Sequence, residues 1–110
     1  MGKLTTQVLD TANGKPAAGM RIELFKLESR GWQRLKTVST NKEGRTDEPL
    51  LEGKELRRGT YRILFFIGDY FGDKVFFDDV PVRFNVADVS EHYHVPLLCS
   101  PWSYTTYRGT

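Results

Sequence analysis

Residues 60–67, TYRILFFI, decide the fold class of this chain of 110 residues. Apolar side chains fill both alternating sets of positions: Tyr61, Ile63, Phe65 and Ile67 on one side, Leu64 and Phe66 on the other. A strand that is apolar on both faces is typical of the centre of a sheet that is covered. We therefore expect residues 60–67 to form a central strand of a β-sandwich.

Period-two alternation continues on both sides of this stretch, with turn residues between the runs. Further strands are expected over residues 4–9, 20–25, 32–38, 80–86, 91–98 and 102–108. Residues 47–59 resemble a loop with room for a short strand, and Pro81 favours an edge position. A short helix is expected near residues 70–77. Seven to eight short strands predict an all-β fold, a two-sheet antiparallel β-sandwich forming one domain over residues 1–110.

Composition narrows the class of protein further. Lys and Arg total 16 against 14 Asp and Glu, which gives a net charge of +2, and 39% of the residues are hydrophobic. These values are typical of a globular protein. No run of Lys or Arg and no long apolar run occurs, so neither nucleic acid nor a membrane is an expected partner. Cys99 is the only cysteine and residues 1–10 lack a signal-peptide pattern, so we expect a cytoplasmic protein.

Few residues could carry chemistry. His92 and His94 are the only histidines, and their spacing of two places both on one face of a strand. Two imidazoles fall short of the ligands that zinc requires, so no metal is expected, and half-buried structural histidines are the alternative. Cys99 is expected to be a small buried side chain. No Gly-x-Ser-x-Gly elbow and no phosphate-binding glycine loop is present.

The last nine residues combine aromatic side chains with a distinctive ending. Trp102, Tyr104 and Tyr107 are interpreted as packing residues of the core and of a subunit interface. The ending Tyr107-Arg108-Gly109-Thr110 places a guanidinium next to a flexible glycine. We expect this ending to be held in place for a functional reason.

Four separated segments resemble one family. They are LTTQVLDTANGKPA at 4–17, TNKEGR at 40–45, TYRILFFIGDYF at 60–71 and EHYHVPLLCSPWSYTTYRG at 91–109. Together they resemble the transthyretin-like family, in particular its 5-hydroxyisourate hydrolases. The resemblance runs along nearly the whole chain, and the 91–109 segment is its most specific part.

The resemblance implies a transthyretin-like (prealbumin-like) sandwich in a homotetramer, a dimer of dimers with active sites at the dimer–dimer interface. It also implies hydrolysis of 5-hydroxyisourate to 2-oxo-4-hydroxy-4-carboxy-5-ureidoimidazoline in urate catabolism, with no cofactor. His94, Arg45 and Thr110 match catalytic positions of the family, and Thr110 replaces the usual serine. His92, Tyr107, Arg108 and Gly109 are expected to bind substrate. Ring opening of a lactam passes through an oxyanion, for which Arg45 or Arg108 is a suitable donor.

Gln7 departs from the family pattern, which has a catalytic histidine at this position. An imidazole with a pKa near 6.5 accepts a proton at neutral pH, whereas a carboxamide does not. Gln7 is therefore consistent with a disabled enzyme, a weakened paralogue, or an active variant in which His94 is the only base. The alternative function is a catalytically inactive transthyretin-like protein that binds a small molecule.

Overall fold

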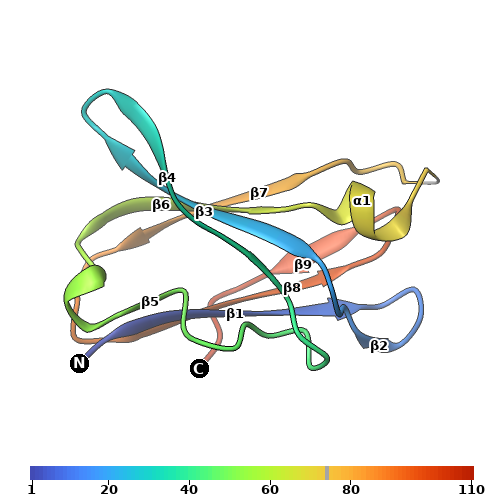
Figure 1. Cartoon of the computed structure of the whole chain (residues 1–110), viewed down its shortest axis with the longest axis horizontal. Coiled ribbons are helices and arrows are strands. Elements are labelled where there is room, and N and C mark those ends of the chain that lie inside the picture. The colour runs from blue at the N-terminus through green and yellow to red at the C-terminus, as the bar shows by residue number, and fades with distance from the viewer. Residues whose placement is uncertain (74) are drawn as a thin grey trace.

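The computed structural model describes residues 1–73 and 75–110 as two packed β-sheets (Figure 1). Nine strands are found within these residues. The five-stranded sheet has the order β2-β1-β8-β9, and β5 also pairs with β1. It contains β1 (Lys3–Asp10), β2 (Lys15–Pro16), β5 (Leu51–Glu52), β8 (His92–Cys99) and β9 (Tyr104–Thr106). The four-stranded sheet has the order β4-β3-β6-β7 and contains β3 (Arg21–Glu28), β4 (Gly31–Ser39), β6 (Gly59–Phe65) and β7 (Val80–Val86).

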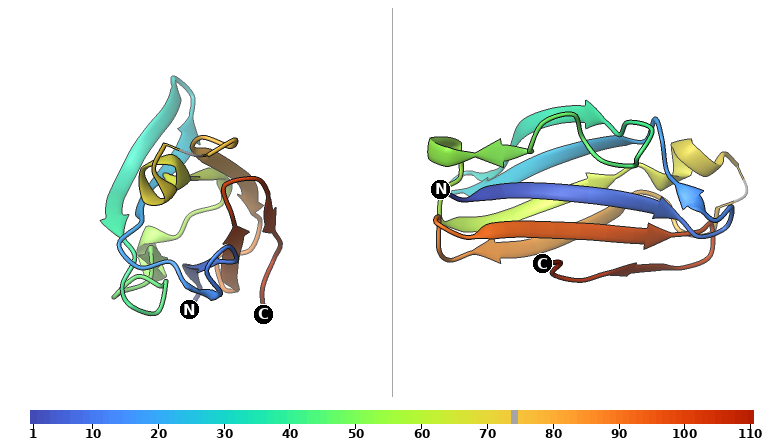
Figure 2. Two further views of the ribbon diagram at one scale, coloured as in Figure 1. Left: turned by 90° about the vertical axis from the view of Figure 1, so that its right-hand side faces the viewer. Right: turned by 90° about the horizontal axis from the view of Figure 1, so that it is seen from below.

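Alternation along the strands builds the core between the two sheets, which the end-on view in Figure 2 shows as separate layers. On β1 the side chains of Leu4 and Val8 face inward and are fully buried. On β6 the inward residues are Tyr61, Ile63 and Phe65, each 0% exposed. Burial of each such apolar side chain contributes roughly 1.5–3 kcal/mol. The prediction of a central strand in a β-sandwich is confirmed, because β6 lies between β3 and β7. The predicted range of 60–67 is too long, because the strand ends at Phe65 and Ile67 begins a short helix.

The antiparallel prediction is wrong for one pair of strands. β1 and β8 run parallel, in register from Lys3 beside His92 to Asp10 beside Cys99. Hydrophobic alternation fixes which face a side chain occupies but not the direction of the neighbouring strand, so the sequence pattern could not distinguish the two arrangements. The parallel pair is the frame on which the polar residues described below are placed.

The helix and the terminal strand also differ from expectation. Helix α1 spans Ile67–Phe71, and Gly72 caps its C-terminal end. It therefore starts three residues before the predicted helix at 70–77. Residue 74 of that predicted helix lies outside the described residues. Besides α1, the segment Gly53–Glu55 forms a short 3-10 helix. None of the helices in the described ranges is long or apolar enough to cross a membrane. β9 is shorter than the predicted 102–108 strand, because the Ser100 amide donates to the Ser103 carbonyl (2.9 Å) and forms a turn there.

The strand count exceeds the predicted seven to eight because two strands, β2 and β5, are only two residues long. Pro81 lies on β7, which is an edge strand as predicted. The interpretation of the terminal aromatic residues as core is wrong for the single protomer. Trp102 is 66% exposed and Tyr107 is 56% exposed, because the chain leaves the sheet on both sides of the short β9.

Candidate active site

A polar cluster on the outer face of the five-stranded sheet joins β1 to β8, the strands that lie side by side in the right-hand view of Figure 2. The parallel register places Thr5 beside His94. The Thr5 hydroxyl oxygen lies 2.8 Å from His94 Nδ1 and 2.8 Å from His92 Nε2. The two imidazoles are on one face, as their spacing predicted, with ring centroids 6.3 Å apart. We call Thr5, His92 and His94 the histidine cluster.

Thr5 was not identified from the sequence. Its contacts with His92 and His94 connect residues 87 and 89 positions apart. The strand-like alternation of residues 4–9 predicts only that Thr5 shares a face with Gln7. Finding Thr5 would have required the parallel pairing of β1 with β8.

Arg45 reaches the same region through a tight turn. Gly44 has φ 75°, a left-handed value that glycine adopts readily, and a side chain there would overlap the Val8 carbonyl. The Val8 amide donates to the Gly44 carbonyl at 2.8 Å. This contact places Arg45 opposite Gln7 in an isolated antiparallel bridge at the edge of β1. The Gln7 amide nitrogen donates to the Glu43 carbonyl at 3.1 Å.

The C-terminal segment approaches His94 from the other side. The Gly109 amide donates to the His94 carbonyl at 2.7 Å, in a second isolated bridge. A Cβ on residue 109 would lie 2.5 Å from the His94 ring, so glycine permits this close approach. Thr110 follows directly and is exposed. Bridges, hydrogen bonds and chain continuity thus link Gln7, Arg45, His94 and Thr110 to one region of the β1–β8 pair.

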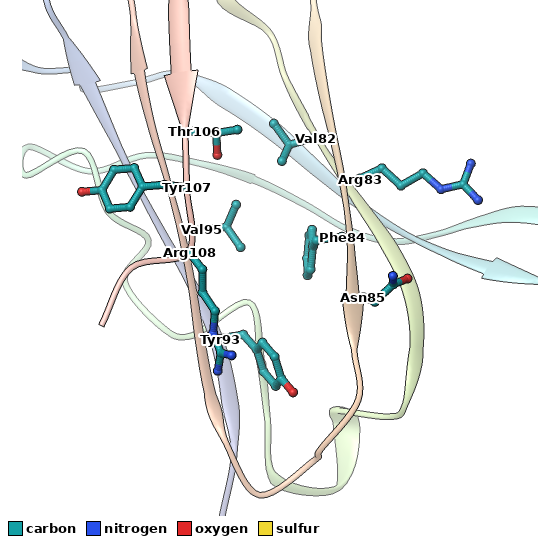
Figure 3. Close-up of a pocket in the computed structure, with 9 residues that line it drawn as sticks. All are labelled: Val82, Arg83, Phe84, Asn85, Tyr93, Val95, Thr106, Tyr107 and Arg108. Atoms are coloured by element: carbon teal, nitrogen blue, oxygen red, sulfur yellow. The ribbon is translucent and has the colours of Figure 1, made fainter.

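Arg108 is directed elsewhere. Its Nη2 lies 3.3 Å from Glu91 Oε1, and its Cζ lies 4.5 Å from the centroid of the Tyr93 ring. Tyr93 alternates with His92 and His94 along β8 and is buried on the inner face. Figure 3 shows Arg108 extending toward Tyr93 at a cavity between β7 and the β8–β9 pair, while Tyr107 points away from Phe84. Of the two arginines considered as oxyanion donors, only Arg45 therefore lies on the side of the histidine cluster.

The electrostatic surroundings keep His94 neutral. Partial burial lowers the pKa of His94, and the positive charge of Arg45 together with His92 lowers it further. At pH 7 the imidazole is therefore uncharged and can accept a proton. Cys99 is fully buried, and desolvation raises the pKa of its thiol to about 12, so it is no nucleophile at neutral pH.

His92 and His94 are two potential metal ligands on one face, and each directs one ring nitrogen at the Thr5 hydroxyl. Over residues 1–73 and 75–110 no group of three or more His, Cys, Asp or Glu side chains forms a metal-binding arrangement. The residues present instead combine a neutral imidazole, a guanidinium and a hydroxyl.

Fold and site together define a class: a two-sheet β-sandwich protein with an imidazole–guanidinium site on one outer face. The family model described as HIUase/Transthyretin matches residues 4–109, and the chain belongs to this family.

Relatives of known name cover the whole chain. A 5-hydroxyisourate hydrolase of Ralstonia nicotianae is 52% identical, with 100% of both chains covered. The protein named 5-hydroxyisourate hydrolase 2 of Rhizobium meliloti is 50% identical over 99% of this chain and 97% of its own.

Solved structures give the same result for the fold. The structure of (S)-allantoin synthase matches 99% of this chain with a TM-score of 0.92 and 44% identity, although the match spans only 44% of that longer chain. The 5-hydroxyisourate hydrolase of Klebsiella pneumoniae matches all of both chains with a TM-score of 0.86 and 29% identity. Transthyretin from Sparus aurata has a TM-score of 0.89 and 28% identity, covering 97% of this chain and 96% of its own.

Proposed function

We propose that this protein is a 5-hydroxyisourate hydrolase. It opens the lactam ring of 5-hydroxyisourate to give 2-oxo-4-hydroxy-4-carboxy-5-ureidoimidazoline, a step of urate catabolism. The observation that carries the proposal is the neutral His94, held by Thr5 on the side of β1 that Arg45 reaches. Full-length relatives 45–53% identical to this chain are named 5-hydroxyisourate hydrolases, which disfavours a role in binding alone.

His94 is the general base of this mechanism. The Thr5 hydroxyl is hydrogen-bonded to Nδ1 of His94, so Nε2 of the same ring is the nitrogen that faces water or substrate in this mechanism. Nε2 takes a proton from the attacking water as its oxygen adds to the lactam carbonyl. The same nitrogen then returns the proton to the ring nitrogen that leaves.

Arg45 stabilises the oxyanion that forms on the carbonyl oxygen. A fixed guanidinium is suited to this role because its charge does not vary with pH and its donors are directional. It also attracts the anionic substrate to the sheet face. The Gly109 backbone and the Thr110 hydroxyl shape the pocket beside His94, and His92, Tyr107 and Arg108 stay predicted substrate contacts.

Gln7 lowers the rate of this enzyme without abolishing it. Its amide donates to the Glu43 carbonyl and so holds the turn that precedes Arg45. A carboxamide supplies no general base, so proton exchange with water and substrate is assigned to His94.

The working unit is a homotetramer, a dimer of dimers in which the active-site face meets a second dimer, in the cytoplasm. Support for assembly comes from the large exposed aromatic side chains near the chain end, Trp102 at 66% and Tyr107 at 56%. Sedimentation velocity over a dilution series measures the state directly. Apparent thermal stability should fall on dilution, since folding and association are linked.

The test of the proposed activity follows the loss of ultraviolet absorbance of freshly generated 5-hydroxyisourate. Three samples are compared: the protein, its Gln7→His variant and buffer. The proposal requires acceleration by the unchanged protein and a greater rate for Gln7→His. Acceleration by the variant alone would identify a disabled hydrolase, and no acceleration by either would refute the activity.

A further inference from the structure

We propose that the Thr5 hydroxyl is a proton relay that couples His94 to His92, so that the two imidazoles and the hydroxyl act as one unit. The inference deepens the proposed hydrolysis and rests on it for its catalytic consequence. The coupling itself is a property of the free protein.

Hydrogen-bond counting restricts the states of the histidine cluster. The Thr5 hydroxyl carries one hydrogen and lies 2.8 Å from a ring nitrogen of each histidine. It can donate to only one of them, so the other must carry a hydrogen and donate to the Thr5 oxygen. At least one of the two imidazoles must therefore carry a hydrogen on the nitrogen that faces Thr5.

The surroundings indicate which histidine takes the positive charge. His92 is exposed, whereas His94 is half-buried. An imidazolium at His94 would also stand beside the Arg45 guanidinium. Transfer of the charge to His92 moves it into solvent, so the favoured direction is outward from His94.

Each proton that enters the relay at His94 is matched by one that leaves it toward His92. In the resting state His94 Nδ1–H donates to Thr5 Oγ1, and the Thr5 hydroxyl donates to His92 Nε2. Water gives a proton to His94 Nε2 as its oxygen bonds to the lactam carbonyl. His94 Nδ1 passes its proton to Thr5, and Thr5 passes its own to His92, which becomes the imidazolium. The reverse sequence delivers the proton to the leaving ring nitrogen and restores all three groups.

Other charged groups near the cluster fix the electrostatic background. Lys3 lies beside His92 in the β1–β8 register. Asp47 and Glu48 line a hollow together with Thr5 and Arg45. Arg108 is paired with Glu91. Substitution of Thr5 changes none of these charges, so it isolates the hydroxyl.

The test compares Thr5→Val, which keeps the shape and removes the hydroxyl, with Thr5→Ser, which keeps the hydroxyl. Thr60→Val is the matched control. It removes a threonine hydroxyl that donates a hydrogen bond to Asn85 on the four-stranded sheet, away from the histidine cluster. Nitrogen-15 NMR of the ring nitrogens reports the tautomer and titration of each histidine without any substrate. Hydrolysis is then measured across pH, with kcat and KM resolved.

The relay predicts coupled titration of His92 and His94 in the unchanged protein and in Thr5→Ser, and independent titration in Thr5→Val. It also predicts that Thr5→Val lowers kcat about tenfold to a hundredfold, part of the ~10²–10⁴ typical of acid–base catalysis, with little change in KM. Independent titration in the unchanged protein would overturn the relay, as would a Thr5→Val enzyme with undiminished kcat. Coupled titration in a protein that fails to hydrolyse the substrate would support the coupling and refute only the proposed function. If Thr5→Val does not fold, His92→Gln provides the second test, because loss of the relay acceptor must lower kcat and alter the titration of His94 in the free protein. Loss of a substrate contact alone would raise KM and leave that titration unchanged.

Discussion

Two polar clusters lie at opposite ends of the same pair of strands, and they differ in how completely their hydrogen bonds are made. At one end Asp10 is 1% exposed. Its carboxylate accepts from the Asn13 amide (3.0 Å), the Asn13 side chain (2.8 Å) and the Tyr70 hydroxyl (2.8 Å). At the other end the histidine cluster is exposed or half-buried, and within residues 1–73 and 75–110 each imidazole makes a side-chain hydrogen bond through one ring nitrogen, to Thr5. The first cluster stabilises the fold, and the second has atoms left for a ligand.

The ionisation of the two clusters follows the same division. Desolvation alone would raise the pKa of Asp10, but hydrogen bonds from Asn13 and Tyr70 outweigh it and lower the pKa. Burial and the neighbouring Asp10 raise the pKa of Tyr70 to about 12, so its hydroxyl stays a donor. His94 instead has a lowered pKa and is kept as a neutral base. A shifted pKa therefore occurs both in the cluster that stabilises the fold and in the cluster proposed for catalysis. The two clusters differ in solvent exposure and in the number of hydrogen-bonding atoms left free.

Apart from substitution of His94 itself, the largest effect should come from Arg45→Gln. Loss of the guanidinium removes the oxyanion donor, so kcat should fall about 10²–10³-fold. Arg45 is exposed, so the melting temperature should stay nearly unchanged. Arg30→Gln, in an exposed turn, is the control. A melting temperature that fell with the rate would place Arg45 among the structural residues.

Asp10→Ala should lower the stability of the fold and leave the rate unchanged, the opposite of Arg45→Gln. It leaves the Tyr70 hydroxyl and the Asn13 amide without their acceptor, so the free energy of unfolding should drop by about 3 kcal/mol. Denaturant unfolding at fixed protein concentration measures this. The kcat of the folded enzyme should be retained. A selective loss of kcat with normal stability would contradict the division between the clusters.

The two clusters should also respond to different pH ranges. The lowered pKa of Asp10 stabilises the fold above its unfolded pKa of about 3.9, and this contribution is lost as pH falls through the folded value. The lowered pKa of His94 should keep the enzyme active below the ordinary histidine pKa of about 6.5. On acidification activity should thus disappear first and the fold later. Asp10→Asn should remove the share of the acid-dependent loss of stability that Asp10 causes below about pH 3.9, and it should leave the pH–rate profile as it is.

Gly109→Ala should have the smallest effect, about a tenfold loss of kcat/KM, because the new methyl group must displace the His94 ring by a short distance. Gly14→Ala controls for a backbone cost alone, since nothing lies within 4 Å of a Cβ there and its cost comes from the left-handed φ of 67°, so kcat/KM should be unchanged. An unchanged rate in Gly109→Ala would show that the C-terminal segment does not position His94.

Local pattern predicted much of the sandwich but not the contacts between distant segments. Alternation was enough to place β6 at the centre and both histidines on one face, and the missing backbone amide of Pro81 indicated an edge strand. The parallel direction of β1 and β8 lies outside what alternation encodes. Thr5 to His94 and Tyr70 to Asp10 are contacts across 89 and 60 residues, so they exist only once the sheets have formed. The direction of Arg108 depends on contacts with Tyr93 and with Glu91, which is 17 residues earlier, and only the folded chain brings these side chains together.

The most direct test of the central claim is the initial rate at which freshly generated 5-hydroxyisourate is consumed by the protein and by its His94→Gln variant. The melting temperature of each is measured at the same protein concentration. The account predicts a rate about 10²–10⁴-fold lower for the variant, with the fold retained. An undiminished rate in a folded His94→Gln protein would contradict it and would move the chemistry away from the histidine cluster.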